Sequence, residues 1–393
     1  MACTFRRVEL AAVKKKFEAL YAGAADGVVR APGRVNLIGE HTDYNGGFVL
    51  PIAIERQTVA LYARRDVRQV RFASAQADAR AAVDLDRPIA PGEPAWANYC
   101  RGVAAGLVAR GVELVGCDIL LDSNIPLGGG LSSSASLEVA TATALLAAAG
   151  RPDAVPPREL AQLCQAAEHE FAGAPCGIMD QSVVIMGQSG QAMLLDCRSG
   201  RIRHIPFDDA GVVLLVADTQ VHHDIADGGY AARRDQCYAA AETLGVKMLR
   251  DADEAMVLRA GDEGRLVGKE LMRARHVVGE IARSLAAVEV LKAGDYHRFG
   301  ELMYGSHASC RDDYEISCDE LNAVVDAAAG CAGVYGARMT GGGFGGCAII
   351  LAEAGQAQQA AQAVQDSFAG RFDRRCPVFA TRAADGASML TLT

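Results

Sequence analysis

The chain has 393 residues, half of them hydrophobic, and carries a formal net charge of −9. A chain of this length can bury a sizeable core and is expected to form two domains. Its acidic balance argues against a nucleic-acid partner, because proteins that bind phosphate backbones present a basic face.

The sequence also argues against a membrane partner and favours a cytoplasmic location. The first residues, MACTFRRVEL, lack the apolar stretch of a signal peptide, and the longest apolar run, Val139–Ala149, is too short to span a bilayer. Cysteines are scattered from Cys3 to Cys376 without a C-x-x-C pair. This pattern is typical of reduced thiols in a cytoplasm.

The first predicted element is an amphipathic helix around the basic run Lys14–Lys16. Val13 and Phe17 flank the lysines, so the lysines are expected on the solvated side of the helix.

The segment GRVNLIGEHTDYNGG, residues 33–47, gathers charged side chains in a short turn punctuated by glycines. It contains Arg34, Glu40, His41 and Asp43. Carboxylates and imidazoles can each accept a hydrogen bond from a hydroxyl, so the set favours a hydroxyl-rich ligand such as a sugar. Any one of these residues could simply cap a turn or lie on the surface, but together in one loop they favour binding.

Apolar runs predict strands interleaved with helices along the chain. The strands are Val67–Ser74, Cys117–Ile125, Gln191–Cys197, Gly211–Thr219 and Cys347–Glu353. The helices are Ser134–Ala149, Glu159–Gly173 and Glu270–Ala293. Because strands and helices do not alternate strictly, the pattern predicts an α+β fold rather than a doubly wound sheet. We place a domain boundary after residue 205, which gives domains 1–205 and 206–393.

The loop PLGGGLSSSAS, residues 126–136, lies between a predicted strand and the helix that begins at Ser134. Its glycines let the backbone approach a phosphate, and the helix start offers free N–H groups and a partial positive charge to an anion. The loop lacks the lysine of the commonest phosphate loop, G-x-x-x-x-G-K-[ST]. An ordinary glycine turn with serine N-caps is the alternative interpretation.

The segment EHEFAGAPCGIMDQ, residues 168–181, contributes two carboxylates from apolar surroundings. Glu168 follows Cys164 by four positions, on the shoulder of the buried helix face, so its side chain could reach into a cleft. Asp180 lies between Met179 and the strand-like run SVVIM, residues 182–186. A carboxylate flanked in this way is either a paired structural charge or a catalytic group.

The run HHD, residues 222–224, could suggest a metal site. Its spacing does not fit a facial triad and no fourth ligand is apparent, so we expect a surface loop.

The late glycine loop TGGGFGGC, residues 340–347, formally matches G-x-G-x-x-G through Gly341, Gly343 and Gly346. A dinucleotide site needs this fingerprint to open a helix, whereas a strand-like run follows here. A nicotinamide-dependent dehydrogenase is therefore disfavoured.

Together these segments resemble the galactokinases, which are members of the GHMP kinase family. GRVNLIGEHTDYNGG resembles the signature specific to galactokinases, whereas IPLGGGLSSSA and TGGGFGGC resemble motifs of the wider family. The resemblance runs nearly end to end, from Ala31 to the closing AADGASML. It implies an N-terminal domain like the second domain of ribosomal protein S5 and a ferredoxin-like C-terminal domain, with the active site between them.

The resemblance also implies a reaction. The protein would transfer the γ-phosphate of MgATP to the C1 hydroxyl of α-D-galactose, which is the first committed step of galactose catabolism. Its partners would be galactose and ATP, with Mg²⁺ as cofactor, and we expect a monomer or a weak dimer.

Site residues are assigned by the same resemblance. Asp180 resembles the catalytic aspartate that would orient the C1 hydroxyl and take its proton, and Arg34 resembles the arginine that would keep it ionised. Ser134 and Glu168 resemble the Mg²⁺ ligands. The sugar would be held by Arg34, Glu40, His41, Asp43, Gly177, Asp180 and Tyr230. The nucleotide would lie against Gly128, Gly129, Gly130, Leu131, Ser132, Ser133, Ser134 and Ala135, with the glycine loop of Gly341, Gly342 and Gly343 as a further family motif. Trp96 would lie either beside the adenine or in the core.

Two rival functions stay open at this level. A kinase of a related sugar, N-acetylgalactosamine or arabinose, would keep the same chemistry. A galactose sensor that binds sugar and ATP without turnover is disfavoured, because sensors of this family lose a Ser-Ala pair that GLSSSAS retains.

Overall fold

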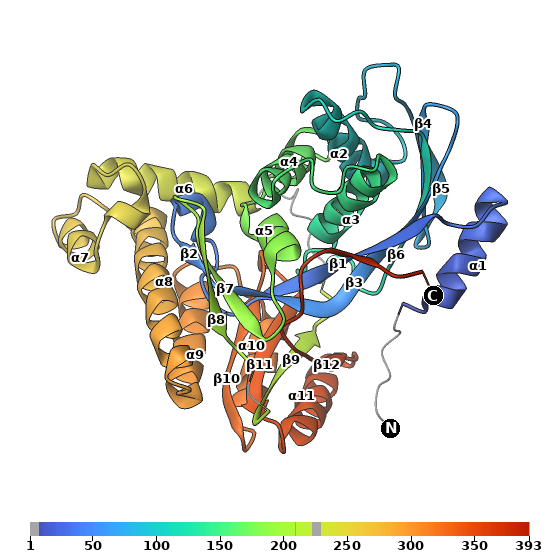
Figure 1. Cartoon of the computed structure of the whole chain (residues 1–393). Helices are drawn as coiled ribbons and strands as arrows, with labels where there is room; N and C mark the ends of the chain where they lie inside the picture. The colour runs from blue at the N-terminus through green and yellow to red at the C-terminus, as the bar shows by residue number, and fades with distance from the viewer. Residues whose placement is uncertain (1–7, 209, 222–228, 393) are drawn as a thin grey trace.

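In the computed structural model the chain is described over residues 8–208, 210–221 and 229–392, and it forms three β-sheets with helices packed around them (Figure 1). The first sheet has the strand order β13-β1-β3-β6-β4-β5. Its strands are β1 Gly27–Asn36, β3 Pro51–Arg64, β4 Gln69–Ser74, β5 Ala77–Asp84, β6 Cys117–Ser123 and β13 Ser388–Leu390. Neighbouring strands run antiparallel except for the parallel pair of β4 and β6.

Different helices cover the two faces of this sheet. Along β1, Val29 and Ala31 face one core while Val28 faces the other, because successive side chains of a strand point to opposite faces. The first core is closed by α2 Asn98–Ala109, α3 Ser133–Ala148 and α4 Pro157–Glu170. The second is closed by the amphipathic helix α1, Leu10–Tyr21, which buries Val13 and Phe17 as predicted.

The second sheet is antiparallel, with the strand order β10-β11-β9-β12. Its strands are β9 Val212–Asp218, β10 Val334–Thr340, β11 Cys347–Glu353 and β12 Val378–Thr381. Helical segments connect β9 to β10, including α10 Asp319–Ala329, and α11 Ala357–Phe372 connects β11 to β12. This order and these crossovers are the split βαβ arrangement of ferredoxin-like domains, as predicted.

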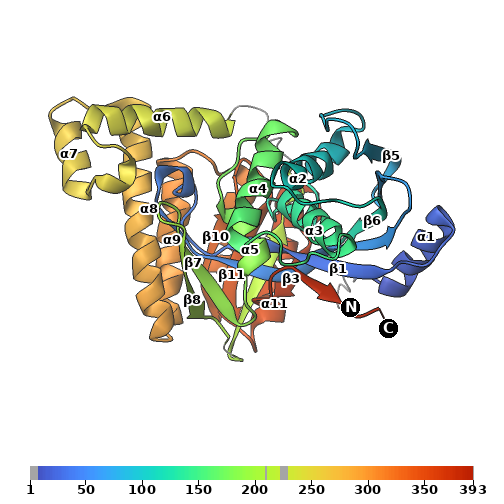
Figure 2. The same cartoon turned by 45° about the horizontal axis from the view of Figure 1, so that its top comes forward.

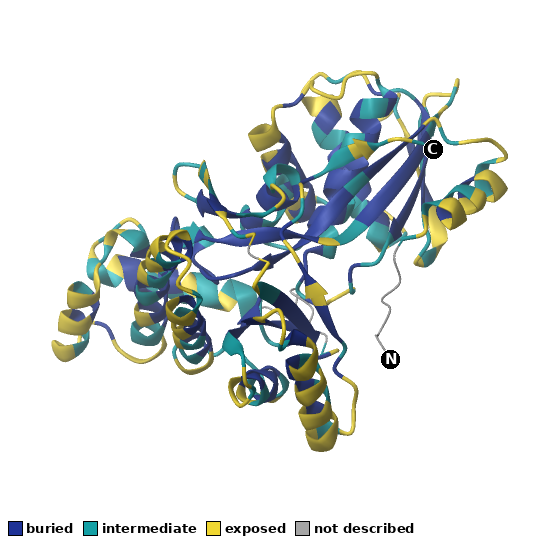
Figure 3. Ribbon diagram, turned by 60° about the horizontal axis from the view of Figure 1, so that its bottom comes forward, coloured by how far each residue is buried: buried dark blue, intermediate teal, exposed yellow. Residues whose placement is uncertain are grey.

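Both faces of the second sheet are buried. In β9, Leu214 and Val216 pack toward β1 and β3, whereas Leu215 and Ala217 pack toward the C-terminal helices. Its run VVLLVA, residues 212–217, is therefore apolar throughout, because neither face meets water. Figure 3 shows these central strands in dark blue and the outward helix faces in yellow.

The third sheet is small and lies beside a long helix hairpin. It consists of β2 Phe48–Val49, β7 Gln191–Asp196 and β8 Arg201–Pro206. The hairpin consists of α8 Gly268–Lys292 and α9 Tyr296–Asp312, and α8 contacts both β2 and β8. Next to it lie α6 Gly229–Leu244 and α7 Glu254–Asp262, and Figure 2 shows α6 running from this corner toward α4 and α5 Met179–Met186.

The predicted strands and helices are present, with ends that differ by a few residues. One segment differs in kind: residues 182–186, predicted as strand-like, belong to helix α5. Val183 and Val184 are buried there, and a short, fully apolar run cannot be assigned to strand or helix from its periodicity. The boundary after residue 205 falls within β8, and β13 returns to pair with β1.

Two further expectations concern helices and histidines. No helix within the described ranges is long and apolar enough to cross a bilayer. The HHD run at 222–224 lies outside the described residues.

The packing of α9 on β10 generates a prediction about Gly300. A Cβ at Gly300 would lie 1.8 Å from the Tyr335 carbonyl oxygen, so the helix and the strand touch backbone to backbone. Gly300→Ala should lower the free energy of unfolding by about 1–3 kcal/mol, as overpacking does. Urea unfolding followed by circular dichroism measures this.

Gly305→Ala is the matched control, because it lies in the same helix and its Cβ would meet only the Arg283 side chain, at 3.8 Å. It should leave the stability unchanged or raise it by up to about 1 kcal/mol, since alanine is the better helix former. Equal effects of the two substitutions would contradict the packing argument.

Candidate active site

The site is built around an ion pair between Arg34 on β1 and Asp180 in the first turn of α5. Arg34 Nε donates to Asp180 Oδ1 at 2.8 Å, and Nη2 donates to Oδ2 at 2.6 Å. This two-pronged geometry is the strongest form of an arginine–carboxylate contact. The Arg34 side chain is only 5 % exposed, so the pair is shielded from water. Arg34 Nη1 also donates to the Gly130 carbonyl, which brings the first glycine loop against the pair.

Ser132 links the same glycine loop directly to Asp180. Its hydroxyl donates to Asp180 Oδ2 at 2.5 Å, and its backbone adopts a left-handed conformation with φ of 60°. Ser132 occupies the N-cap of α3 but makes no capping hydrogen bond with its side chain. The interpretation of this loop as an ordinary serine-capped turn is therefore wrong for Ser132: the hydroxyl that could have capped the helix is used on a carboxylate instead.

The two glycine loops pack against each other backbone to backbone. A Cβ at Gly341 would lie 2.8 Å from the Gly130 carbonyl oxygen, and a Cβ at Gly346 would lie 2.9 Å from that of Gly129. Gly341 and Gly346 also have φ of 89° and 80°, which disfavours any other residue. Strand β11 begins at Cys347, directly after the second loop, so the helix that a dinucleotide fingerprint requires is absent at this point.

Glu40 and His41 are both held by the second glycine loop. Glu40 Oε1 accepts from the Gly341 N–H at 2.9 Å and from the guanidinium of Arg338 on β10 at 3.1 Å. His41 Nε2 lies 3.0 Å from the Gly342 carbonyl oxygen, which can only accept, so Nε2 carries the proton. Nδ1 then accepts from the Tyr44 hydroxyl at 2.8 Å. Burial lowers the pKa of His41 to about 3, so the imidazole is neutral at physiological pH.

Asp43 and Gly177 touch directly. A Cβ at Gly177 would lie 1.4 Å from Asp43 Oδ2, so no side chain fits at position 177 while Asp43 keeps this rotamer. Asp43 Oδ1 accepts from the Tyr44 N–H at 2.9 Å. Burial, together with the negative charges of Asp180 and Glu40, raises the pKa of Asp43 to about 7. This carboxyl group therefore changes its protonation state near neutral pH.

All the residues predicted to hold a sugar line one cavity. Tyr230, at the start of α6, closes it, with its ring centroid 5.0 Å from that of His41 and 5.3 Å from that of Tyr44. The lining residues are Arg34, Gly39, Glu40, His41, Asp43, Val49, Pro175, Cys176, Gly177, Met179, Asp180, Tyr230, Gly341 and Gly342. The side chains come from β1 and its following loop, from β2, from the first turn of α5 and the segment before it, and from α6, so segments distant in the sequence form the wall.

Glu168 and Ser134 meet near Asp180, whose charge acts on Glu168. Glu168 lies near the end of α4 and is 3 % exposed. Burial and the Asp180 charge raise its pKa to about 7, although a hydrogen bond with the Ser134 hydroxyl opposes this shift. No lysine, arginine or histidine within the described ranges forms an ion pair with Glu168. A buried carboxylate without a cation, next to a neutral hydroxyl, is the kind of oxygen pair that Mg²⁺ accepts.

The remaining residues predicted to contact nucleotide fall into two groups. Leu131 and Ala135 bury their side chains in the core, so they could contact a phosphate only through their backbone, whereas Ser133 and Ser134 are half-buried. Trp96 is also half-buried: it packs on the core, and its indole N–H donates to the Ala79 carbonyl at 3.1 Å. The arrangement is compatible with both interpretations of Trp96.

Sequence reasoning missed Arg338, Tyr44 and Gln181, which hold predicted site residues in place. Arg338 binds Glu40, Tyr44 binds His41, and Gln181 donates to Glu168 at 2.8 Å. Only Arg338 left a signal that could have been used, namely a charged residue within a strand-like run that ends at a glycine loop.

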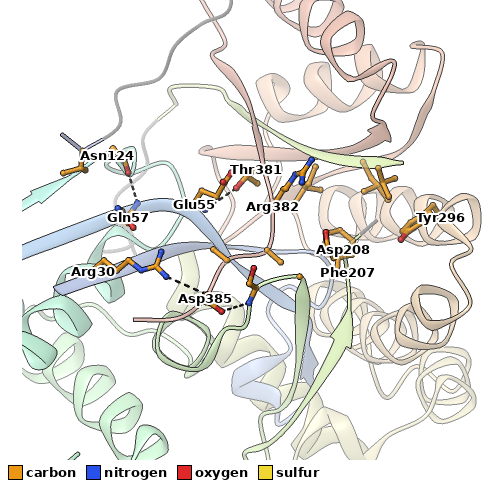
Figure 4. Close-up of a pocket in the computed structure, with 18 residues that line it drawn as sticks. Arg30, Glu55, Gln57, Asn124, Phe207, Asp208, Tyr296, Thr381, Arg382 and Asp385 are labelled. Atoms are coloured by element: carbon orange, nitrogen blue, oxygen red, sulfur yellow. Dashed lines mark hydrogen bonds and ion pairs between the residues drawn. The ribbon is translucent and has the colours of Figure 1, made fainter. Parts of the chain in front are cut away.

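A second, roomier cavity of about 590 Å³ lies elsewhere and contains none of the predicted site residues (Figure 4). Of its charged side chains, Arg30 and Asp385 already have partners: Arg30 lies 4.0 Å from Asp385, and Asp385 accepts from the Ser189 N–H at 2.9 Å. No glycine loop borders this cavity, so its surroundings do not indicate a site of group transfer.

Comparisons with known proteins agree with this geometry. The galactokinase galactose-binding signature matches residues 15–64, and the N-terminal and C-terminal domains of GHMP kinases match residues 98–188 and 287–370. The human galactokinase is 46% identical over 98% of this chain and 97% of its own length. The galactokinase of Streptomyces coelicolor is 45% identical over 96% of this chain and 98% of its own.

Solved structures extend the same comparison. The crystal structure of Lactococcus lactis galactokinase complexed with galactose has a TM-score of 0.91 and 31% identity, covering 97% of this chain and all of that one. The Methanococcus jannaschii mevalonate kinase, at 19% identity and a TM-score of 0.64 over 92% of this chain and 99% of its own, shares the fold. The predicted two-domain fold is confirmed. From its signature, its near full-length relatives and its fold, the chain belongs to the galactokinase family of GHMP kinases.

Proposed function

We propose that this protein is an ATP-dependent sugar kinase that phosphorylates the C1 hydroxyl of α-D-galactose and releases galactose 1-phosphate. One observation carries the proposal. Asp180 lines the cavity together with the other predicted sugar residues, and its Oδ2 also accepts a hydrogen bond from Ser132 of the glycine loop. The two halves of the predicted site therefore converge on a single carboxylate, as transfer between a nucleotide and a sugar requires.

In this mechanism Asp180 receives the C1 hydroxyl. Both of its oxygens already accept hydrogen bonds from Arg34 or Ser132, and these bonds fix the position of the carboxylate. Asp180 therefore acts mainly by orienting the hydroxyl, and takes its proton as the bond to phosphorus forms. Arg34 lies where it can stabilise negative charge that develops on the transferred group.

The sugar hydroxyls would be held by polar side chains that line the cavity. Both ring nitrogens of neutral His41 are bonded to protein partners. His41 would therefore contact the sugar through the face or edge of its ring and not as a hydrogen-bond acceptor. Asp43 and the Glu40 oxygen that Arg338 does not hold supply the acceptors, and Tyr230 adds a hydroxyl. A polar pocket of this kind favours an acceptor rich in hydroxyl groups over an apolar one.

The phosphates are bound by backbone and by a cation. The start of α3 presents free N–H groups, which replace the lysine that this loop lacks. Ser134 and Glu168 would hold Mg²⁺, which neutralises phosphate charge when bound. No cluster of three or more His, Cys, Asp or Glu side chains that could hold a metal occurs in the part of the chain that the structure describes. The cation would therefore complete its shell with phosphate and water oxygens.

The same proposal includes a cytoplasmic location. Each of the cysteines from Cys100 to Cys376 is a free thiol. Unpaired thiols in such number are typical of a reducing compartment, where ATP is also available.

A substrate panel tests the proposed function. ADP release is measured with galactose, N-acetylgalactosamine, arabinose, glucose and mevalonate as acceptors. Galactose should give the highest kcat/KM. A higher kcat/KM for N-acetylgalactosamine or arabinose would identify the protein as a kinase of that sugar. Binding of galactose without any ADP release would identify it as a sensor.

Asp180→Asn tests the role of the central carboxylate. It keeps the shape of the side chain but removes the charge that Arg34 neutralises, and kcat should fall by roughly 10²–10⁴-fold, as for other positioned acid–base groups. Circular dichroism and thermal unfolding serve as controls for folding. Activity above about a tenth of wild type would remove Asp180 from this role.

Asp43 generates a prediction about protons. Hydroxyls that donate to its carboxylate favour the ionised form, so galactose should lower the pKa of Asp43 from its free value of about 7. Galactose binding at pH 6.5 should therefore release protons, and affinity should weaken as the pH falls below about 7. Calorimetry in two buffers of different ionisation enthalpy, without nucleotide or metal, counts the protons.

Asp43→Asn is the control for this measurement, because an amide does not titrate. The buffer dependence should disappear in this variant. Proton release that persists in Asp43→Asn, or is missing in the wild type, would show that Asp43 does not accept from the sugar.

A further inference from the structure

A second buried acid, Glu138, lies behind the site and has no part in the mechanism above. Glu138 follows Ser134 by four residues on α3, so the two side chains share one face of the helix. It is fully buried, as is Gln181, the neighbour of Asp180 on α5. A polar pair at this depth is unusual enough to require a reason.

Gln181 joins Glu138 to Glu168. Its Nε2 donates to Glu168 Oε2 at 2.8 Å and to Glu138 Oε2 at 3.1 Å, so one amide group bridges two carboxyl groups. The Cys176 thiol also contacts Glu168 Oε2, at 3.3 Å. Glu168 is thus held through one oxygen, while its Oε1 stays outside this network.

The bridge is expected to lower the stability of the folded protein. Glu138 Oε1 and Gln181 Oε1 are buried without a hydrogen-bond partner among the described residues. No lysine, arginine or histidine of the described ranges forms an ion pair with Glu138, and burial raises its pKa well above the usual range. Well-packed apolar residues in such places are often neutral or stabilising, so the polar bridge points to a function.

An amide suits a function at Glu168 better than a cationic residue would. A lysine or arginine at position 181 would fix the Glu168 carboxylate but would also cancel the charge that attracts a metal ion. A neutral donor orients the carboxylate and leaves that charge in place. Gln181 needs an anchor of its own, because a free glutamine side chain has several rotamers, and Glu138 is that anchor.

We propose that Glu138, acting through Gln181, is a positioning residue that orients the Glu168 carboxylate for the nucleotide-bound cation. This inference rests on the proposed function, in which Glu168 is a metal ligand. Neither Glu138 nor Gln181 touches the sugar cavity, so their effect is confined to the cation and phosphate side of the site.

Glu138→Leu and Gln181→Leu test the proposal with two readouts. The first is the Mg²⁺ concentration that gives half of the maximal rate at saturating galactose and ATP. The second does not depend on turnover: Mn²⁺ binding to the protein with ADP, followed by electron paramagnetic resonance. Each variant should raise the Mg²⁺ concentration needed for half of the maximal rate, and lower the Mn²⁺ affinity, by roughly 10–100-fold. This is the usual effect of losing an outer partner of a metal ligand. Galactose affinity measured by calorimetry should stay at its wild-type value.

Three further variants separate positioning from a general structural role. Glu138→Gln keeps an uncharged acceptor for the Gln181 amide and should restore the wild-type Mg²⁺ requirement. The double variant Glu138→Leu/Gln181→Leu should be no worse than Gln181→Leu alone, because both residues act by one route. Thr141→Val removes another buried polar group of α3, which bonds to Leu137 instead, and should leave the Mg²⁺ requirement unchanged.

The outcomes also distinguish this inference from the proposed function. An unchanged Mg²⁺ requirement and Mn²⁺ affinity in Gln181→Leu, in a wild type that phosphorylates galactose, would overturn the positioning role alone. Additive effects in the double variant would overturn it as well. If Glu138→Leu does not fold, the Mg²⁺ requirements of Gln181→Leu and Glu138→Gln still test the positioning role. A wild type that phosphorylates no sugar would overturn the proposed function, and the Mn²⁺ titration would still report on Glu168.

Discussion

A fully buried arginine joins the parts of the chain that form the site. Arg338 on β10 lies 3.1 Å from Glu40 Oε1 and 3.9 Å from Glu280 Oε1 on α8, and it donates to the Asn36 carbonyl at 3.2 Å. A buried guanidinium is tolerated only when carboxylates and carbonyls surround it. Each partner comes from a different segment, so the loop after β1, the ferredoxin-like sheet and the long helix hairpin must all be in place before this charge is satisfied.

The same cluster also holds the loop after β1 in place. Although burial opposes ionisation of Glu280, the guanidinium groups of Arg283 and Arg338 lower its pKa to about 2. The ionised Glu280 then accepts from the Gly39 N–H at 2.9 Å, directly before Glu40. The backbone that presents Glu40 and His41 is thus fixed by charges that never contact a ligand. Binding groups held in this way lose little freedom when a substrate arrives.

The sequence predicted the elements and the local motifs well, because these depend on nearby residues. The glycine loop between a strand and α3 follows from its glycines, and the charged turn at Glu40 follows from its composition. The bidentate pair of Arg34 and Asp180 joins residues 146 positions apart, and no spacing rule could place it without the resemblance. The helical state of 182–186 was missed because so short and largely apolar a run has no periodicity that separates a helix from a strand. Arg338 and Gln181 were missed because their partners are distant in sequence.

The return of β13 to β1 has a consequence for how the protein is made. Arg30 on β1 bonds to Ser388 across a separation of 358 residues. During synthesis β1 can pair with β3 early, but its outer edge stays open until the ribosome has added almost everything that follows. An open strand edge is a template for pairing with other chains. The nascent protein therefore passes through a long period in which its first sheet can aggregate, and the last strand of the sheet ends that period.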